Sequence, residues 1–224
     1  MNRAALYDWE VAQVAQRNDQ DAAFYVELVT GPVLELACGT GRLTQHLARA
    51  ATRVNARVVG VDLDAEMLAA AKRKTHQGAD LLQADMSCLH FAGRPFALVA
   101  IPYNSLQLLT TVDAQVACLA GACAALRPGG RLALEVSTFG AGGPVDEQLL
   151  AAAGGIKLWG SLEVDGPFVR YRKRFTGAVT HHDETVLRDY AAGEFEEVLA
   201  AGGFAVEAAR PFRQGRLVVA APAG

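Results

Sequence analysis

Paired cysteines, long apolar runs and a leader-like start are all lacking in this sequence of 224 residues. Its four cysteines (Cys38, Cys88, Cys118 and Cys123) form no CxxC pair, which argues against a zinc site or disulfide framework and favours a reduced, cytoplasmic protein. No stretch approaches the roughly 18 apolar residues that a membrane span requires. The first ten residues include acidic side chains where a signal peptide would be apolar, so we expect neither secretion nor a membrane partner.

An excess of charge of one sign is also missing. The formal net charge is −3, which argues against a general nucleic-acid-binding protein. Hydrophobic residues make up 51% of the chain, enough for a core that needs no disulfide or metal. Composition and length together predict one globular domain over residues 1–224, and they leave the oligomeric state open between monomer and homodimer. The histidines and cysteines form no spacing typical of a metal site.

The most informative stretch is residues 32–48, PVLELACGTGRLTQHLA. Its apolar run at 33–36 is typical of a buried parallel strand, and Gly39 and Gly41 then turn the chain into a helix. Glycine suits such a turn because the backbone angles disfavour a Cβ and because a ligand approaches the main chain closely there. The helix that follows directs free N–H groups at that ligand. Glu35 is an acid inside the buried run, which predicts that its carboxylate meets a donor.

Further acids stand at the ends of the next two predicted strands. Asp62 closes the second strand, 21 residues after Gly41, a separation at which an acid reaches a ribose that rests on the glycine turn. Asp64 is the better N-cap for the helix that follows, so we assign Asp62 to a cofactor and Asp64 to capping. The third predicted strand ends in Asp85, for which a role as turn former ahead of Ser87 is the alternative.

These motifs resemble those of the class I S-adenosylmethionine-dependent methyltransferases, whose motif I is usually (E/D)xGxGxG. Here it reads ELACGTG, with Ala37 in place of the first glycine, and LRPGG at 126–130 is also common in this group. The resemblance runs from about Val33 to the end of the chain. It implies S-adenosyl-L-methionine as cofactor, a small-molecule acceptor as substrate, and an adenine contacted by Asp85, Leu63 and Met86. The cofactor-binding residues that it implies are Glu35, Ala37, Gly39, Gly41, Asp62, Leu63, Asp85, Met86 and Ile101.

The acceptor is expected at the end of the fourth predicted strand, FALVAI, because open α/β sheets bind ligands at the carboxyl ends of their strands. Tyr103 and Asn104 follow this strand directly and are the leading catalytic candidates. Their PYNS context is not the NPPY-type signature of enzymes that methylate nucleobases or glutamine amides. His181 is the third candidate, as a base for an oxygen acceptor. Its neighbour His182 points to the opposite face of a predicted strand, and a neutral amine needs no strong base.

The predicted fold class is a doubly wound α/β sandwich with a seven-stranded sheet whose last strand is antiparallel. Two short helices within residues 1–30 and an inserted antiparallel meander over 156–190 are expected to form a lid, with Tyr7 or Tyr25 in reach of the site. Glycines are dense over 139–155, where we expect a connection with one short helix near 146–152. The terminal runs FAVEAARPF and RLVVAAPA predict a hairpin.

The segment PFVRYRKRF within the predicted lid alternates in character. Its period of two places Val169, Tyr171, Lys173 and Phe175 on one face and Arg170, Arg172 and Arg174 on the other. Two interpretations remain open for the arginines: they bind an acidic substrate, or they form a solvated face balanced by acids such as Glu163, Asp183 or Glu184.

Two other function classes compete with methyl transfer. A nicotinamide-dependent dehydrogenase would need a third glycine after GxG, where this chain has Thr44, and its sheet would not end in an antiparallel hairpin. A regulatory module that keeps the cofactor pocket without chemistry is the second alternative. Heat protection by S-adenosylmethionine but not by NAD separates the first rival from the methyltransferase.

Overall fold

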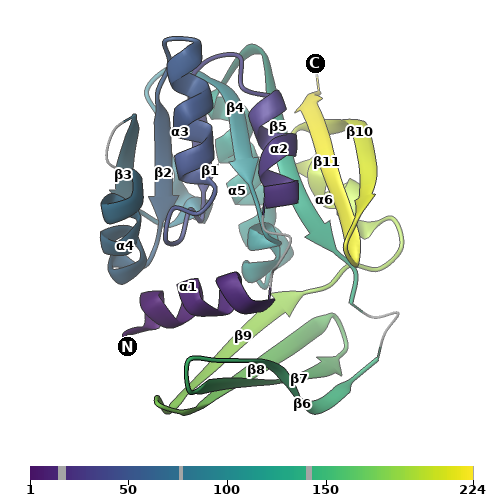
Figure 1. Cartoon of the computed structure of the whole chain (residues 1–224). Coiled ribbons are helices and arrows are strands. Elements are labelled where there is room, and N and C mark those ends of the chain that lie inside the picture. The colour runs from purple at the N-terminus through teal and green to yellow at the C-terminus, as the bar shows by residue number, and fades with distance from the viewer. Residues whose placement is uncertain (15–18, 76–77, 140–142, 224) are drawn as a thin grey trace.

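The computed structural model describes residues 1–14, 19–75, 78–139 and 143–223. Two sheets organise the chain (Figure 1). The elements that precede the second sheet are α1 (Arg3–Val14), α2 (Asp19–Glu27), β1 (Val33–Leu36), α3 (Thr44–Arg53), β2 (Val58–Asp62), α4 (Ala65–Thr75), β3 (Ala79–Gln83), the 3₁₀ turn η1 (Met86–Cys88), β4 (Phe96–Ile101), the 3₁₀ turn η2 (Ser105–Leu108), α5 (Val112–Ala125) and β5 (Leu126–Ser137). After them come β6 (Val145–Ala153), β7 (Ile156–Asp165), β8 (Phe168–Gly177), β9 (His181–Arg188), α6 (Glu194–Ala201), β10 (Phe204–Phe212) and β11 (Gly215–Pro222).

The larger sheet has seven strands in the order β10-β11-β5-β4-β1-β2-β3. Strands β1 to β5 run parallel, whereas β11 is antiparallel to both β5 and β10. The predicted fold class and terminal hairpin are therefore confirmed. The antiparallel hairpin also opposes the dehydrogenase alternative, whose sheet stays parallel to its end.

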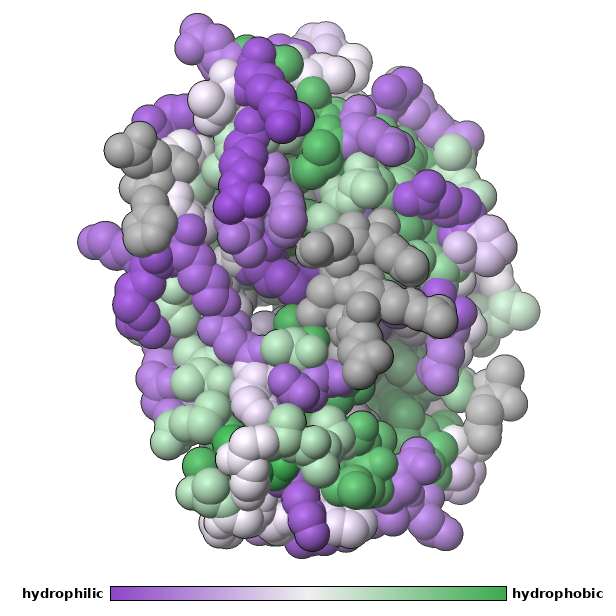
Figure 2. All heavy atoms as spheres, in the orientation of Figure 1, coloured by the Kyte–Doolittle hydropathy of each residue, from purple (hydrophilic) through white to green (hydrophobic). Residues whose placement is uncertain are grey.

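Helices cover both faces of this sheet, α2 and α3 on one face and α5 and α6 on the other (Figure 1). Strands β1 and β4 are consequently buried at every position, which explains why their sequences are continuously apolar rather than alternating. The outer side of α3 is hydrophilic on the face shown in Figure 2, whereas apolar side chains gather lower down, over α1 and the second sheet. Because all parallel strands end at the same edge, the turns after β1, β2 and β4 meet there.

The second sheet, which we call the lid sheet, has four antiparallel strands in the order β6-β7-β8-β9. It lies beyond the carboxyl edge of the parallel strands, with α1 between the two sheets (Figure 1). The predicted meander is thus present, but it begins at Val145 rather than near residue 156.

One helix prediction is wrong. The segment expected to be helical near 146–152 is strand β6, which pairs antiparallel with β7 from Val145 to Ala153. Its sequence DEQLLAA favours helix locally, and pairing with β7 overrides that weak preference. Gly140 and Gly142, in the predicted glycine-rich connection, lie outside the described residues.

Candidate cofactor and acceptor site

The turn after β1 owes its shape to three residues with positive φ. The φ angles are 55° at Ala37, 54° at Gly39 and 78° at Gly41. A Cβ at Gly39 would meet no atom within 4 Å, so the space over this residue is open to a ligand. A Cβ at Gly41 would lie only 3.1 Å from the Cβ of Ala71, so this glycine serves the packing of the turn on α4. Ala37 carries a left-handed conformation that costs a non-glycine residue about 1–2 kcal/mol.

Asp62, at the end of β2, holds the turn in place. Its Oδ2 accepts a hydrogen bond from the N–H of Gly39 at 2.7 Å, and its Oδ1 accepts one from the N–H of Asp64 at 2.9 Å. Asp64 in turn accepts from the N–H of Glu66 at 2.8 Å, as expected of a helix N-cap. The structure therefore brings Asp62 to the glycine turn and gives Asp64 the capping role predicted for it.

Glu35 lies under the turn, in the middle of β1. Its side chain is buried, and burial raises the pKa of its carboxyl to about 8. Oε2 of Glu35 has no hydrogen-bond partner among the described residues. Nearby, Arg42 donates both terminal nitrogens to the fully buried carboxylate of Asp21, in a fork geometry that fixes α2 against the turn. The oxygen Oε2 therefore lacks a donor in the described part of the chain, although the side chain of Thr44 lies close enough to the carboxyl to offset part of the rise in its pKa.

The loop after β4 is strained in a way the sequence does not reveal. Tyr103 and Asn104 both have left-handed backbones, with φ of 56° and 58°. The guanidinium groups of Arg42 and Arg213 lie 5.9 Å and 5.3 Å from the centroid of the Tyr103 ring. The Oδ1 atom of Asn104 is buried and has no partner among the described residues. Left-handed non-glycine residues are costly and tend to occur at functional sites.

Glu135 is a residue that the sequence prediction missed. It lies in β5 with only 1% of its surface exposed, and its Oε1 accepts from Arg213 at 3.3 Å. Burial raises the pKa of its carboxyl. The signal that marked Glu35, an acid inside an apolar strand, is equally present in the LALEVS run around Glu135. Arg213 lies in the turn between β10 and β11, far along the sequence, so no local pattern reveals it.

Helix α1 packs against the carboxyl edge of the parallel strands. The carboxylate of Asp8 accepts hydrogen bonds at 2.6 Å from Thr40 Oγ1, in the glycine turn, and at 2.6 Å from Lys74 Nζ, at the end of α4. Tyr7 is half-buried beside Tyr103, and burial raises the pKa of its phenol. Tyr25, by contrast, is a residue of α2 that lies fully buried in the core, with its ring centroid 5.0 Å from that of Phe24. Of the two candidate tyrosines, Tyr7 is the one beside the acceptor loop.

The other side of α1 packs on the lid sheet. Its apolar residues Leu6 and Trp9 join a core cluster with Leu158 and Phe175. Lys173 Nζ donates to Glu10 Oε2 at 2.8 Å, and both side chains are about nine-tenths buried. Helix α1 therefore connects the glycine turn to the lid sheet.

The remaining predicted cofactor residues lie along the same edge. Asp85 is exposed and its Oδ1 accepts from the N–H and Oγ of Ser87 at 2.8 Å and 2.7 Å, which lowers the pKa of the carboxyl. The alternative role of Asp85 as a turn former is therefore present, and its contact with adenine stays a prediction. The Leu63 side chain is 68% exposed, Met86 is half-buried, and the Ile101 side chain is fully buried in the core. Contact of Ile101 with a cofactor therefore stays a prediction.

His181 lies at the start of β9, with its ring 6.1 Å from the ring of Phe175. Its role as a base stays a prediction. His182 lines a different hollow, on the outer face of the lid sheet, so the two histidines do point to opposite faces. On that outer face Arg170 and Arg172 pair with Glu184, Arg172 also pairs with Glu163, and Arg174 pairs with Glu147. These pairs favour the solvated face over the acidic-substrate interpretation.

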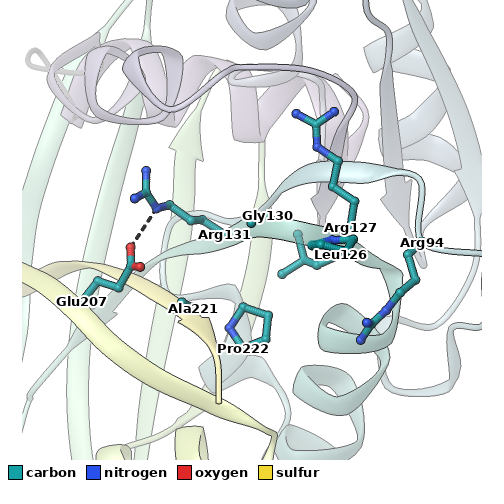
Figure 3. A pocket seen from close by; sticks show the side chains of 10 residues that line it. Arg94, Leu126, Arg127, Gly130, Arg131, Glu207, Ala221 and Pro222 are labelled. Carbon is teal, nitrogen blue, oxygen red and sulfur yellow. Dashed lines mark hydrogen bonds and ion pairs between the residues drawn. The ribbon is translucent and has the colours of Figure 1, made fainter. Parts of the chain in front are cut away.

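A cavity of about 350 Å³ lies at the opposite edge of the large sheet, where β4 and β5 begin (Figure 3). Arg131 in its wall pairs with Glu207 at 2.7 Å, while the guanidinium groups of Arg94 and Arg127 point away from one another. This cavity is remote from the glycine turn, and the polar groups that line it do not converge on one point.

In the described part of the chain, no group of three or more histidine, cysteine, aspartate or glutamate side chains is placed to hold a metal ion. No helix within the described ranges is long and apolar enough to cross a membrane.

Part of this chain is similar to known proteins in sequence. Residues 33–130 match the family model described as a methyltransferase domain. A 2-phytyl-1,4-naphtoquinone methyltransferase from Thermosynechococcus vestitus is 38% identical over 118 residues, a match that covers 51% of this chain and 50% of the relative. The chain thus spans about half the length of this curated relative.

Solved structures extend the likeness to the whole fold. DesVI from Streptomyces venezuelae superimposes with a TM-score of 0.83 at 24% identity, covering 99% of each chain. CalS10, an amino pentose methyltransferase from Micromonospora echinaspora solved with bound S-adenosylmethionine, has a TM-score of 0.80 at 24% identity, covering 96% of this chain and 95% of its own. Residues 33–130 therefore match a methyltransferase domain, and the whole chain has the fold of the class I S-adenosylmethionine-dependent methyltransferases.

Proposed function

We propose that this chain transfers the methyl group of S-adenosylmethionine to a nitrogen or oxygen atom of a small molecule. The observation that carries the proposal is the contact of Asp62 Oδ2 with the N–H of Gly39, at 2.7 Å, beneath open space. This contact places the Asp62 carboxylate, which can bind two ribose hydroxyls, beside the main chain of Gly39, which a ligand can approach closely. The cofactor's sulfonium supplies an electrophilic methyl carbon, so the protein's task is alignment of the nucleophile.

The residues present fit that cofactor at several points. The absent side chain at Gly39 leaves room for the adenosyl group, and Asp62 lies directly beside it. Leu63 and Met86 offer apolar surface for the adenine ring, with Asp85 at the same edge for its amino group. Glu35, buried beneath the turn with a free oxygen, favours a donor such as an ammonium group nearby. These residues would bind and orient the cofactor without taking part in bond formation.

The acceptor is proposed to lie against Tyr103 and Asn104. The buried Oδ1 of Asn104 can accept a hydrogen bond from an N–H or O–H of the acceptor and so hold its lone pair toward the methyl group. A buried acceptor oxygen without a partner costs about 1–3 kcal/mol, which such a donor would offset. Names of the relatives support small acceptors, since one acts on a naphthoquinone and another on an amino pentose.

Alignment alone can lower the barrier by about 7–11 kcal/mol, so a neutral amine acceptor requires no strong base. For an amine, the proton can leave to water after methyl transfer. For a hydroxyl acceptor a base is needed, and His181 is the proposed candidate. Replacing His181 by glutamine should therefore lower turnover of hydroxyl acceptors while sparing amines.

Titration calorimetry with S-adenosylhomocysteine and, separately, with NAD⁺ tests the proposal. We expect heat with the first and none with the second. A panel of small amines, phenols and quinols, incubated with S-adenosylmethionine, should then contain an acceptor that yields S-adenosylhomocysteine. Binding without turnover on any acceptor of the panel would support the regulatory module instead, and absence of binding would contradict the proposal altogether.

A further inference from the structure

The chain crosses between the large sheet and the lid sheet twice. It leaves after Ser137, the last residue of β5, and returns after Arg188, the last residue of β9. The side chain of Gln107, in η2, contacts both crossing points and is fully buried. No sequence pattern marked this residue.

The amide of Gln107 uses both of its donors and its acceptor on these crossings. Nε2 donates to the carbonyl oxygen of Ser137 at 3.0 Å and to that of Arg188 at 2.9 Å. Oε1 accepts from the N–H of Ser137 at 2.9 Å. A carboxylate of the same length would lose both donors, and an apolar side chain would lose all three bonds. The site therefore matches an amide specifically.

Gln107 is also close in sequence to the proposed acceptor loop. Tyr103 and Asn104 directly precede η2, and the N–H of Gln107 donates to the carbonyl oxygen of Asn104 at 2.9 Å. Gln107 thus connects the acceptor loop with the last residue of β5 and the last residue of β9. A change at this amide would displace the lid relative to the acceptor loop. Its hydrogen bonds to described residues include none to the glycine turn or Asp62.

We propose that Gln107 is a positioning residue that sets the orientation of the lid sheet over the acceptor loop. The inference rests on the proposed function for the meaning of that loop. It predicts that removing the amide impairs use of the acceptor and loosens the lid, and leaves cofactor affinity unchanged.

The chain offers a matched control in Gln115. This glutamine is equally buried, and its Nε2 donates to Leu109 O at 2.8 Å while its Oε1 accepts from Tyr190 Oη at 2.9 Å. It holds neither Ser137 nor Arg188. A replacement of Gln115 by methionine therefore reports the general cost of removing a buried amide from this part of the core.

The two tryptophans provide a lid-specific signal. Trp9 and Trp159 are the only tryptophans in the sequence, and they lie on α1 and β7. Acrylamide quenching of their fluorescence thus reports the environment of the lid rather than of the large sheet. Hydrogen exchange at the amide of Ser137 reports the crossing itself, because that N–H is bound only by the Gln107 side chain among the contacts described.

The experiment compares Gln107→Met, Gln107→Glu and Gln115→Met with the unchanged chain. For both Gln107 variants we expect at least about tenfold faster exchange at Ser137, stronger tryptophan quenching, and affinity for S-adenosylhomocysteine within about twofold. Once an acceptor is found, its KM should rise by about tenfold or more in the Gln107 variants and stay unchanged in Gln115→Met. If either Gln107 variant fails to fold, the other carries the test.

Equal quenching and equal exchange in the Gln107 and Gln115 variants would overturn the proposal and leave Gln107 a merely structural residue. So would a loss of cofactor affinity as large as the loss in acceptor use. If the unchanged chain bound no S-adenosylhomocysteine, the proposed function would fail, yet the quenching and exchange results would still decide whether the amide orients the lid.

Discussion

Replacement of Asp62 by asparagine tests whether the carboxylate of Asp62 binds the ribose of the proposed cofactor. Asparagine keeps the size of the side chain and one oxygen that can accept from the N–H of Gly39, a bond now 2.7 Å long. It removes the negative charge that would bind two ribose hydroxyls. Charge-assisted hydrogen bonds contribute about 1.5–3 kcal/mol each, and neutral ones about 0.5–1.5 kcal/mol. The change should therefore cost about 2–3 kcal/mol of binding free energy, a rise in Kd of about 30-fold to 150-fold.

Titration calorimetry with S-adenosylhomocysteine measures this loss directly. Asp64→Asn is the matched control, because Asp64 lies two residues away, carries the same charge and caps α4 through the N–H of Glu66. We expect it to lower the free energy of unfolding by at most about 1 kcal/mol and to leave Kd within about twofold. Equal Kd values for Asp62→Asn and the unchanged chain would refute the assignment of the ribose to Asp62, and equal losses in both variants would show a non-specific effect of charge.

Three further predictions concern stability. Burial raises the pKa of Glu35 to about 8, so the ligand-free protein should lose stability as pH rises from about 5 to 8, by up to about 1.4 kcal/mol per pH unit. Thermal unfolding at several pH values should show a flatter slope for Glu35→Gln. An unchanged slope would contradict the burial argument. Gly41→Ala should cost about 1–3 kcal/mol, since its Cβ would lie 3.1 Å from that of Ala71, and a melting temperature equal to the parent's would refute the packing role. Glu10→Gln should cost about 1–3 kcal/mol and expose the lid to proteolysis, because the nine-tenths buried Lys173 loses its charged partner at 2.8 Å and keeps only Asp183, at 3.5 Å. Full stability in Glu10→Gln would show that α1 does not depend on this pair.

Short patterns in the sequence predict much of the fold. Parallel strands buried on both faces must be apolar throughout, so FALVAI and VLEL predict β4 and β1 directly. The position of Asp62 beside Gly39 follows from the same logic, since neighbouring parallel strands end at one edge. Local patterns of this kind thus predict which edge of the sheet carries the proposed cofactor site.

Other features depend on contacts between distant residues, and these the sequence could not predict. Strand β6 carries a helix-favouring sequence and becomes a strand because β7 pairs with it. Arg213 approaches the Tyr103 ring only because the last hairpin folds back along β5. Glu135 is different, because the pattern that marks Glu35, an acid inside an apolar strand, also surrounds Glu135 in the sequence.

Diffraction from crystals grown with S-adenosylhomocysteine tests the central claim most directly. The account predicts density for the ligand over Gly39, with both ribose hydroxyls within about 3 Å of the Asp62 carboxylate and the sulfur facing Tyr103 and Asn104. Density at any other place, such as the arginine-lined cavity at the opposite edge, or a ribose without contact to Asp62, would contradict it.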